Sequence, residues 1–260
     1  TLRGLRRRGF PPAAIRQFCE STGLSKSNSV IDMSLLEECV RDDLNAHALR
    51  AMMVLKPLKV VIENFEEGKV QELEAACHPQ KPELGGRIIP FSREIYIEQT
   101  DFMENPPKDY FRLSPGKEVR LRHSYVIRCN DVVRDPKTQE IIELRCSYDQ
   151  NTLGKNPEGR KVKGVVHWVS APHAKLITAK LYDRLFTIED PAAKDNFTEY
   201  LNPNALQIIQ GALVEPFVFE RPLGQPFQFE RVGYFLMEKL PNGEYSANRI
   251  VALKDDWKKC

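Results

Sequence analysis

Three arginines recur in the stretch Gly116–Arg128, where polar and apolar residues alternate with a period of two. Such alternation is typical of a strand with one buried face and one wet face. Arginines two residues apart on one face would stand about 7 Å from each other, close to the spacing of successive phosphates or bases in single-stranded RNA. The apolar face would hold Val119, Leu121, Tyr125 and Ile127, and the wet face Arg120, Arg122, Ser124 and Arg128. The pattern predicts either a nucleic-acid contact or a solvated strand whose arginines pair with carboxylates.

The distribution of charge favours the first interpretation. The sequence of 260 residues has a net charge of only +2, but residues 105–175 hold 14 Lys and Arg against 8 Asp and Glu. A local basic surface on a nearly neutral protein indicates a polyanion as the partner of one face. No apolar run approaches the roughly 20 residues of a membrane span, so we expect no membrane partner and a cytoplasmic location.

The sequence contains none of the common signatures of catalytic sites. It has no phosphate-binding loop, no dinucleotide-binding glycine pattern, no Gly-x-Ser-x-Gly motif and no His-Glu-x-x-His motif. Its six cysteines form no Cys-x-x-Cys pair, so we interpret them as free thiols in a reducing cytosol, with Cys19 and Cys39 as small core residues. We therefore expect no catalytic residues, no metal site and no covalent chemistry in this chain.

Periodicity and turn signals predict a mainly β fold with an N-terminal α-helical stem. Pro11 and Pro12 open a helix that Gly23 closes, and Asp32 caps a second helix. After residue 54 short strands alternate with turns, among them a long hairpin at 125–148, which is typical of antiparallel barrels. Roughly 200 β-rich residues exceed one small barrel, so we expect two. The expected domains are a stem at 1–55, a proximal barrel of 56–67 plus 171–260, and an inserted distal barrel at 68–170.

Several long blocks carry a resemblance to a known family. They are Arg6-Arg7-Arg8-Gly9-Phe10, the run from Lys161 to Ser170 (KVKGVVHWVS) and the run from Phe227 to Phe235 (FQFERVGYF). These blocks resemble the stem and the anticodon-binding barrels of glutaminyl-tRNA synthetases of the bacterial type, and the similarity runs from Thr1 to about Trp257. Neither nucleotide-binding motif of that family's catalytic half is present, since Leu24-Ser25-Lys26-Ser27 only mimics one of them in a capping turn. We expect the chain to be the C-terminal anticodon-binding portion of a longer protein.

The resemblance implies a partner, a reaction and a set of contact residues. The whole enzyme would be a class I synthetase that attaches glutamine to tRNA(Gln) with ATP and Mg, whereas this portion would hold no cofactor and be inactive alone. The partner would be the anticodon stem-loop, without DNA, and the protein would be a monomer. The implied nucleic-acid contacts are Asn45, Arg50, Gln80, Arg112, Arg120, Arg122, Gln228 and Arg231. Departures from the family pattern at Leu49, Gln80 and Asp109 concern loop contacts.

Gln228 and Arg231 carry the most specific of these expectations. The resemblance assigns them to the middle anticodon base, a uracil, whose N3–H donor lies between two carbonyl acceptors. A Gln amide can satisfy a donor and an acceptor at once. In a regular strand two residues three apart point to opposite faces, so the strand must end, bulge or turn between them.

Two other functions stay open. The chain could be the same region of a eukaryote- or archaea-type glutamyl-tRNA synthetase, or a barrel that binds another RNA or a protein without any ligase role.

Overall fold

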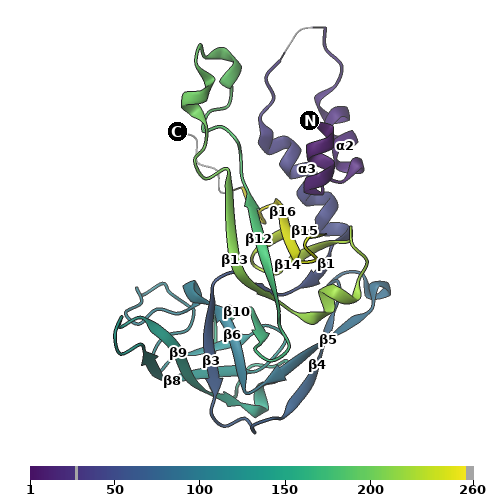
Figure 1. Cartoon of the computed structure of the whole chain (residues 1–260). Coiled ribbons are helices and arrows are strands. Elements are labelled where there is room, and N and C mark those ends of the chain that lie inside the picture. The colour runs from purple at the N-terminus through teal and green to yellow at the C-terminus, as the bar shows by residue number, and fades with distance from the viewer. Residues whose placement is uncertain (27–28, 256–260) are drawn as a thin grey trace. The chain divides into compact units, whose positions relative to one another are not determined.

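The computed structural model describes residues 1–26 and 29–255, and contacts divide the chain into two compact units (Figure 1). The first unit contains the described residues of 1–50, 177–210 and 221–260, and the second contains 51–176 and 211–220. In the part of the chain that the structure describes, the fold is mainly β, with barrel-like sheets and with α-helices only between residues 2 and 47. Within the described ranges, no helix has both the length and the apolar composition to cross a membrane.

Local capping signals define the helices of the first unit. They are α1 (Leu2–Arg8), α2 (Pro12–Thr22) and α3 (Met33–His47). Pro12 starts α2 and Gly23 follows its end, while the Asp32 carboxylate accepts a hydrogen bond of 2.8 Å from the backbone N–H of Ser34 at the start of α3. These boundaries confirm the predicted helices. Cys39 is buried as expected, but Cys19 is exposed on α2, so its prediction as a core residue was wrong.

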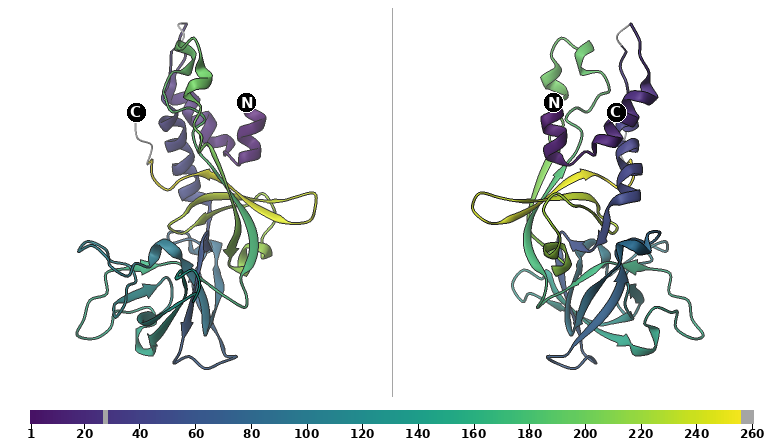
Figure 2. Two further views of the ribbon diagram at one scale, coloured as in Figure 1. Left: turned by 60° about the vertical axis from the view of Figure 1, so that its left-hand side comes forward. Right: turned by 90° about the vertical axis from the view of Figure 1, so that its right-hand side faces the viewer.

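The β strands of the first unit form one face of a common core with the helices. The strands that lie wholly or mostly in this unit follow one another in the sheet order β1-β14-β15-β16-β12-β13. They are β1 (Leu49–Ala51), β12 (Lys175–Tyr182), β13 (Leu206–Val214), β14 (Pro226–Phe229), β15 (Gly233–Lys239) and β16 (Tyr245–Val251). The β15–β16 hairpin can be followed in yellow in Figure 2. Val40 and Leu44 of α3 pack with Tyr234 and Ile250 in a buried cluster. The apolar stripe of α3 is therefore buried on this sheet.

The second unit is built round its own core. Its strands are β2 (Met53–Val54), β3 (Pro57–Ile62), β4 (Val70–Ala76), β5 (Gly86–Ser92), β6 (Glu94–Glu98), β7 (Glu118–Leu121), β8 (Val126–Arg134), β9 (Ile141–Asp149), β10 (Val165–Val166) and β11 (Trp168–Ser170). Seven of them form a sheet in the order β10-β7-β8-β9-β3-β6-β11, and β4 pairs with β5. Phe91 and Trp168 are fully buried inside, with ring centroids 5.4 Å apart.

The antiparallel expectation was only partly right. The predicted hairpin is present as β8 and β9, but β3 runs parallel to β9, β7 parallel to β10, and β12 parallel to β16. Each parallel pair joins strands that are far apart in the sequence, and such separations give the chain room to return in the same direction. Alternation fixes the buried face of a strand, but it says nothing about the direction of the partner.

The two units also divide the sequence differently from the expected domains. Residues 56–67 were expected with 171–260, but β3 pairs with β6 and β9 inside the second unit. The helices of the expected stem share a unit with residues 177–210 and with the described residues after 220. The physical reason is that the helices bury their stripe on β15 and β16, so they form no separate core.

The arginine-rich stretch is a hairpin with a tight turn, although the alternation predicted one strand. β7 ends at Leu121, β8 begins at Val126, and Arg120 pairs with Val126 across the hairpin. His123 has a φ of 58°, in the left-handed region that His tolerates better than most residues. Val119 and Leu121 are buried as predicted, but Ser124 is also buried, so the expected wet face is not continuous.

Candidate nucleic-acid interface

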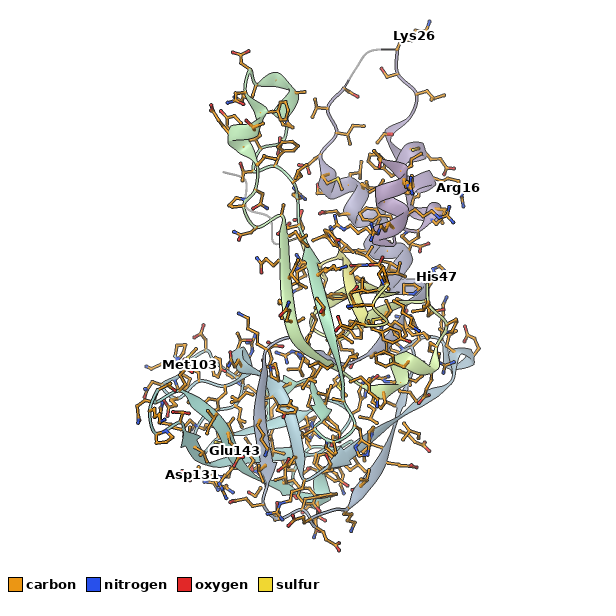
Figure 3. All side chains as sticks on the ribbon, viewed as in Figure 1. Arg16, Lys26, His47, Met103, Asp131 and Glu143 are labelled. Carbon is orange, nitrogen blue, oxygen red and sulfur yellow. The ribbon has the colours of Figure 1, made fainter. Side chains whose placement is uncertain are left out.

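The end of α3 brings two of the expected contact residues together. His47, labelled in Figure 3, is the last residue of α3, and Asn45 lies two residues before it. The Arg50 guanidinium turns back to this end, and its Nη1 donates to the Ala48 carbonyl at 2.8 Å. Its Nη2 donates at 3.0 Å to both the backbone carbonyl and the Oδ1 of Asn45. A cation at a helix C-terminus satisfies free carbonyls and interacts favourably with the helix dipole.

Burial gives Arg50 an unusual environment for a charged group. Only 5% of the residue is exposed. This burial lowers the pKa of Arg50, while the nearby Tyr234 and Glu230 act in the opposite direction. An arginine remains charged at neutral pH even so. Arg50 is therefore a fixed positive charge whose hydrogen bonds are directed at α3.

Strand β14 ends between Gln228 and Arg231, as a joint contact of the two residues with one base would require. β14 ends at Phe229, one residue after Gln228, and the Val232 N–H donates to the Phe229 carbonyl at 2.9 Å in a turn. Arg231 has a φ of 69°, which is strained for a non-glycine residue, and its side chain is exposed. The predicted interruption of the strand between the two residues is confirmed.

Tyr234 joins the end of α3 to Gln228. The Gln228 Nε2 donates to the Tyr234 Oη at 2.8 Å, and the Tyr234 Oη lies 3.3 Å from the Oδ1 of Asn45. Arg50, Asn45, Tyr234 and Gln228 thus form one chain of hydrogen bonds, which we call the relay. Sequence reasoning missed Tyr234. The available signal was a Tyr inside an apolar strand, because a buried phenol usually has a polar partner.

The relay lies beside an open hollow of about 650 Å³ in the first unit. Asn45, Gln228 and Tyr234 contribute to its lining, together with Ser34, Glu38, Arg41, Asp42, Leu253 and Asp255. Three of these residues are acidic and one is basic. The hollow therefore disfavours a phosphate and suits an uncharged group with hydrogen-bond donors, such as a base edge.

Arg120 is more strongly engaged in the second unit than a free contact residue would be. Its Nη1 donates to the Thr152 carbonyl at 2.9 Å and to the Ser124 carbonyl at 3.4 Å. Its Nη2 donates to the Lys155 carbonyl and to the Oδ1 of Asn156. Arg120 is half-buried, and these bonds attach the loop at 150–156 to β7. A direct RNA contact by Arg120 remains a prediction.

The other expected contacts in this unit are more exposed. Arg122 lies in the turn after β7 and is exposed. Arg112 is also exposed, but its Nε lies 3.3 Å from the carboxylate of Asp101, which is 1% exposed, and its Nη1 donates to the Thr100 carbonyl at 2.9 Å. Gln80 is exposed in the loop between β4 and the next short helix. The structure therefore joins Asn45 directly to Arg50, and joins Gln228 to them through Tyr234. Gln80, Arg112, Arg120 and Arg122 belong to a different unit.

Comparison with known families identifies the two β regions. Residues 48–149 match the family described as tRNA synthetases class I (E and Q), anti-codon binding domain, and residues 165–238 match a second family model with the same description.

Curated relatives cover nearly the whole chain. A glutamine--tRNA ligase from Neisseria gonorrhoeae is 50% identical over 266 residues, which is 99% of this chain and 47% of the relative. Another from Pseudomonas putida is 52% identical over 263 residues, again 99% of this chain and 46% of the relative. The chain thus spans about half the length of the curated relatives it matches. It belongs to the anticodon-binding domains of the class I tRNA synthetases for Glu and Gln.

Proposed function

We propose that this chain binds the anticodon stem-loop of tRNA(Gln), so that a class I synthetase can attach glutamine to that tRNA with ATP. The observation that carries the proposal is the relay of Arg50, Asn45, Tyr234 and Gln228 beside an open hollow. The Gln228 amide, which lines this hollow, offers a donor and an acceptor that can pair with the edge of an unstacked base.

Within this proposal the two units have different tasks. Gln228 and Arg231 contact the middle anticodon base, with Asn45 and Arg50 at the same loop. Gln80, Arg112, Arg120 and Arg122 contact other parts of the stem-loop, where the excess positive charge of residues 105–175 attracts the RNA.

The ATP and Mg of the reaction would belong to a catalytic part that carries nucleotide-binding motifs. This sequence has neither of the two nucleotide-binding motifs of the family's catalytic half. Residues 1–26 and 29–255 hold no group of three or more His, Cys, Asp or Glu side chains suited to a metal. We assign no nucleotide step to its residues. The protein would act as a monomer in the cytoplasm, where translation takes place, without DNA or a membrane as a partner.

Binding to RNAs that differ only in the anticodon tests the proposal. The 260-residue chain should bind the stem-loop of tRNA(Gln) more tightly than a variant with cytosine at the middle position. Gln228→Ala should weaken binding to the uracil-bearing RNA by about 1–3 kcal/mol, and should weaken binding to the cytosine variant less. Gln225→Ala is the matched control, since Gln225 lies in the same unit before β14 and is outside the relay.

Three outcomes would contradict the proposal. Equal weakening of both RNAs by Gln228→Ala would remove the base assignment. Tighter binding to the stem-loop of tRNA(Glu) would favour the glutamyl-tRNA synthetase alternative. No anticodon-dependent binding at moderate salt would favour a barrel with another partner.

A further inference from the structure

We propose that Tyr234 is a positioning residue, which orients the Gln228 amide so that its carbonyl oxygen is offered to the base, and that Arg50 sets this orientation through Asn45. The inference rests on the proposed function, because it explains how the relay would distinguish uracil from cytosine.

The direction of the relay starts at Arg50. A guanidinium has only donors, so the Asn45 side-chain atom 3.0 Å from the Arg50 Nη2 must be the carbonyl oxygen, Oδ1. The Arg50 guanidinium also donates to two backbone carbonyls, and only 5% of the residue is exposed, so it has little freedom to move away. Arg50 therefore fixes which end of the Asn45 amide faces Tyr234.

The Tyr234 hydroxyl donates to Asn45 and accepts from Gln228, so it links the orientations of the two amides. Because the Oδ1 of Asn45 can only accept, the Tyr234 hydroxyl donates its single proton to it across 3.3 Å. The oxygen of Tyr234 must then accept from Gln228, which places the Nε2 of Gln228 at 2.8 Å. Burial raises the pKa of Tyr234, so the phenol keeps the proton that this direction requires.

The remaining edge of Gln228 is then defined. Its Oε1 and the second N–H of its Nε2 are available for a base. This pair matches a uracil edge, in which the N3–H donor stands beside a carbonyl acceptor. Cytosine presents an acceptor at N3. This N3 would face the Oε1 of Gln228, and neither atom carries a proton for a hydrogen bond. A Gln228 amide turned the other way would lose this preference.

The burial of Tyr234 limits substitution by water. The residue is 3% exposed and belongs to the cluster that also contains Val40 and Ile250. A Tyr234→Phe chain keeps the ring in this cluster and loses only the hydroxyl. The Gln228 amide can then turn in either direction, and the relay no longer selects one of them.

The experiment compares Tyr234→Phe with Tyr182→Phe, using anticodon stem-loop RNAs with uracil or cytosine at the middle position. Tyr182 is in the same unit, and its ring contacts Arg8, so its replacement is a matched loss of a hydroxyl outside the relay. Tyr234→Phe should reduce the ratio of the two affinities about three- to tenfold, which is the effect of one hydrogen bond. Tyr182→Phe should leave the ratio unchanged, and both variants should keep the far-UV circular dichroism of the unsubstituted chain.

Two changes at Asn45 test whether the donor–acceptor direction of the relay, and not only its packing contacts, sets the preference for uracil. Asn45→Asp keeps an acceptor for Arg50 and Tyr234, so the uracil-to-cytosine ratio should stay near that of the unsubstituted chain even if both affinities fall. Asn45→Leu removes the acceptor and should reduce the ratio as Tyr234→Phe does. A ratio that falls equally in Asn45→Asp and Asn45→Leu overturns the proposed direction.

A measurement without RNA distinguishes failure of the relay from failure of the proposed function. In the ¹H–¹⁵N spectrum, the Gln228 side-chain amide, assigned by its loss in Gln228→Glu, should shift in Tyr234→Phe and stay in place in Tyr182→Phe. An unchanged amide, or an unchanged ratio in Tyr234→Phe, overturns the orientation by Tyr234. Equal binding of both RNAs by the unsubstituted chain, with the amide shift present, overturns the proposed function instead.

Discussion

Loss of one partner from the buried ion pair of Arg87 and Glu215 should strongly destabilise the second unit. Arg87 lies on β5 and Glu215 directly follows β13, and the Arg87 Nε is 2.7 Å from the Glu215 Oε1. Their side chains are 0% and 3% exposed. The Glu215→Leu change would leave the Arg87 guanidinium buried without this carboxylate. Removal of one partner from a buried pair costs about 3–5 kcal/mol, because the remaining charge loses its compensation.

Urea unfolding followed by Trp fluorescence measures how much Glu215→Leu destabilises the second unit. Trp168 is fully buried in the second unit, and a Trp257→Phe background makes it the only tryptophan. With a dependence on urea of about 2 kcal/mol per molar, a loss of 3–5 kcal/mol lowers the midpoint by about 1.5–2.5 M. The double variant Arg87→Met, Glu215→Leu should recover most of the loss, since apolar side chains can replace a buried pair at little cost.

The control is the exposed pair of Lys69 and Glu66, whose side chains are 57% and 75% exposed. The Glu66→Gln change should hardly move the midpoint, because water screens such pairs. A loss below about 1 kcal/mol in Glu215→Leu, or a double variant as unstable as Glu215→Leu, would refute the reasoning.

Three further predictions follow from particular side chains. Arg120→Ala should lower both the affinity for RNA and the urea midpoint, because the Arg120 guanidinium attaches the loop at 150–156 to β7. Arg122→Ala should lower the affinity for RNA and leave the urea midpoint unchanged. If Arg122 contacts a phosphate, its loss should also reduce the slope of log affinity against log salt concentration by about one. The pKa of Glu238 is held below its ordinary value of 4.5, chiefly by a hydrogen bond from Asn248, so its contribution to stability is present above pH 4.5 and is lost as the pH falls through the lowered pKa. Glu238→Gln should therefore flatten the acid side of a plot of urea midpoint against pH, and an unchanged acid side would contradict this. Arg231→Gly should weaken RNA binding. It should also raise the free energy of unfolding by about 0.5–1 kcal/mol, because glycine adopts a positive φ without strain. A lower free energy of unfolding would show instead that the Arg231 side chain supports the fold.

Local signals made the helices and one hairpin predictable. Pro12, Gly23 and Asp32 act within one turn of the chain, so their effect can be read from the sequence. The same holds for the β8–β9 hairpin, where the Asp135 carboxylate accepts from the backbone N–H groups of Lys137 and Thr138.

Other features depend on partners that the sequence does not reveal. The turn after Leu121 contains no Gly, Pro or Asn, so nothing marked it before the φ of His123 was known. The parallel pairing of β3 with β9 and the bond between Tyr234 and Asn45 join residues far apart in the chain. The resemblance implied Asn45, Arg50 and Gln228 as RNA contacts, but it indicated neither the hydrogen bonds that join them nor the part of Tyr234.

The shared core of the helices and the C-terminal strands has a consequence during synthesis on the ribosome. Leu44 of α3 packs in the same cluster as Tyr234 and Ile250, about 190 residues later in the chain. At about 5–20 residues per second, the helices emerge roughly 10–40 seconds before the strands that cover them. Over that interval the apolar stripe of α3 lacks the strands that bury it in the folded unit, and pauses in translation after residue 50 would prolong its exposure.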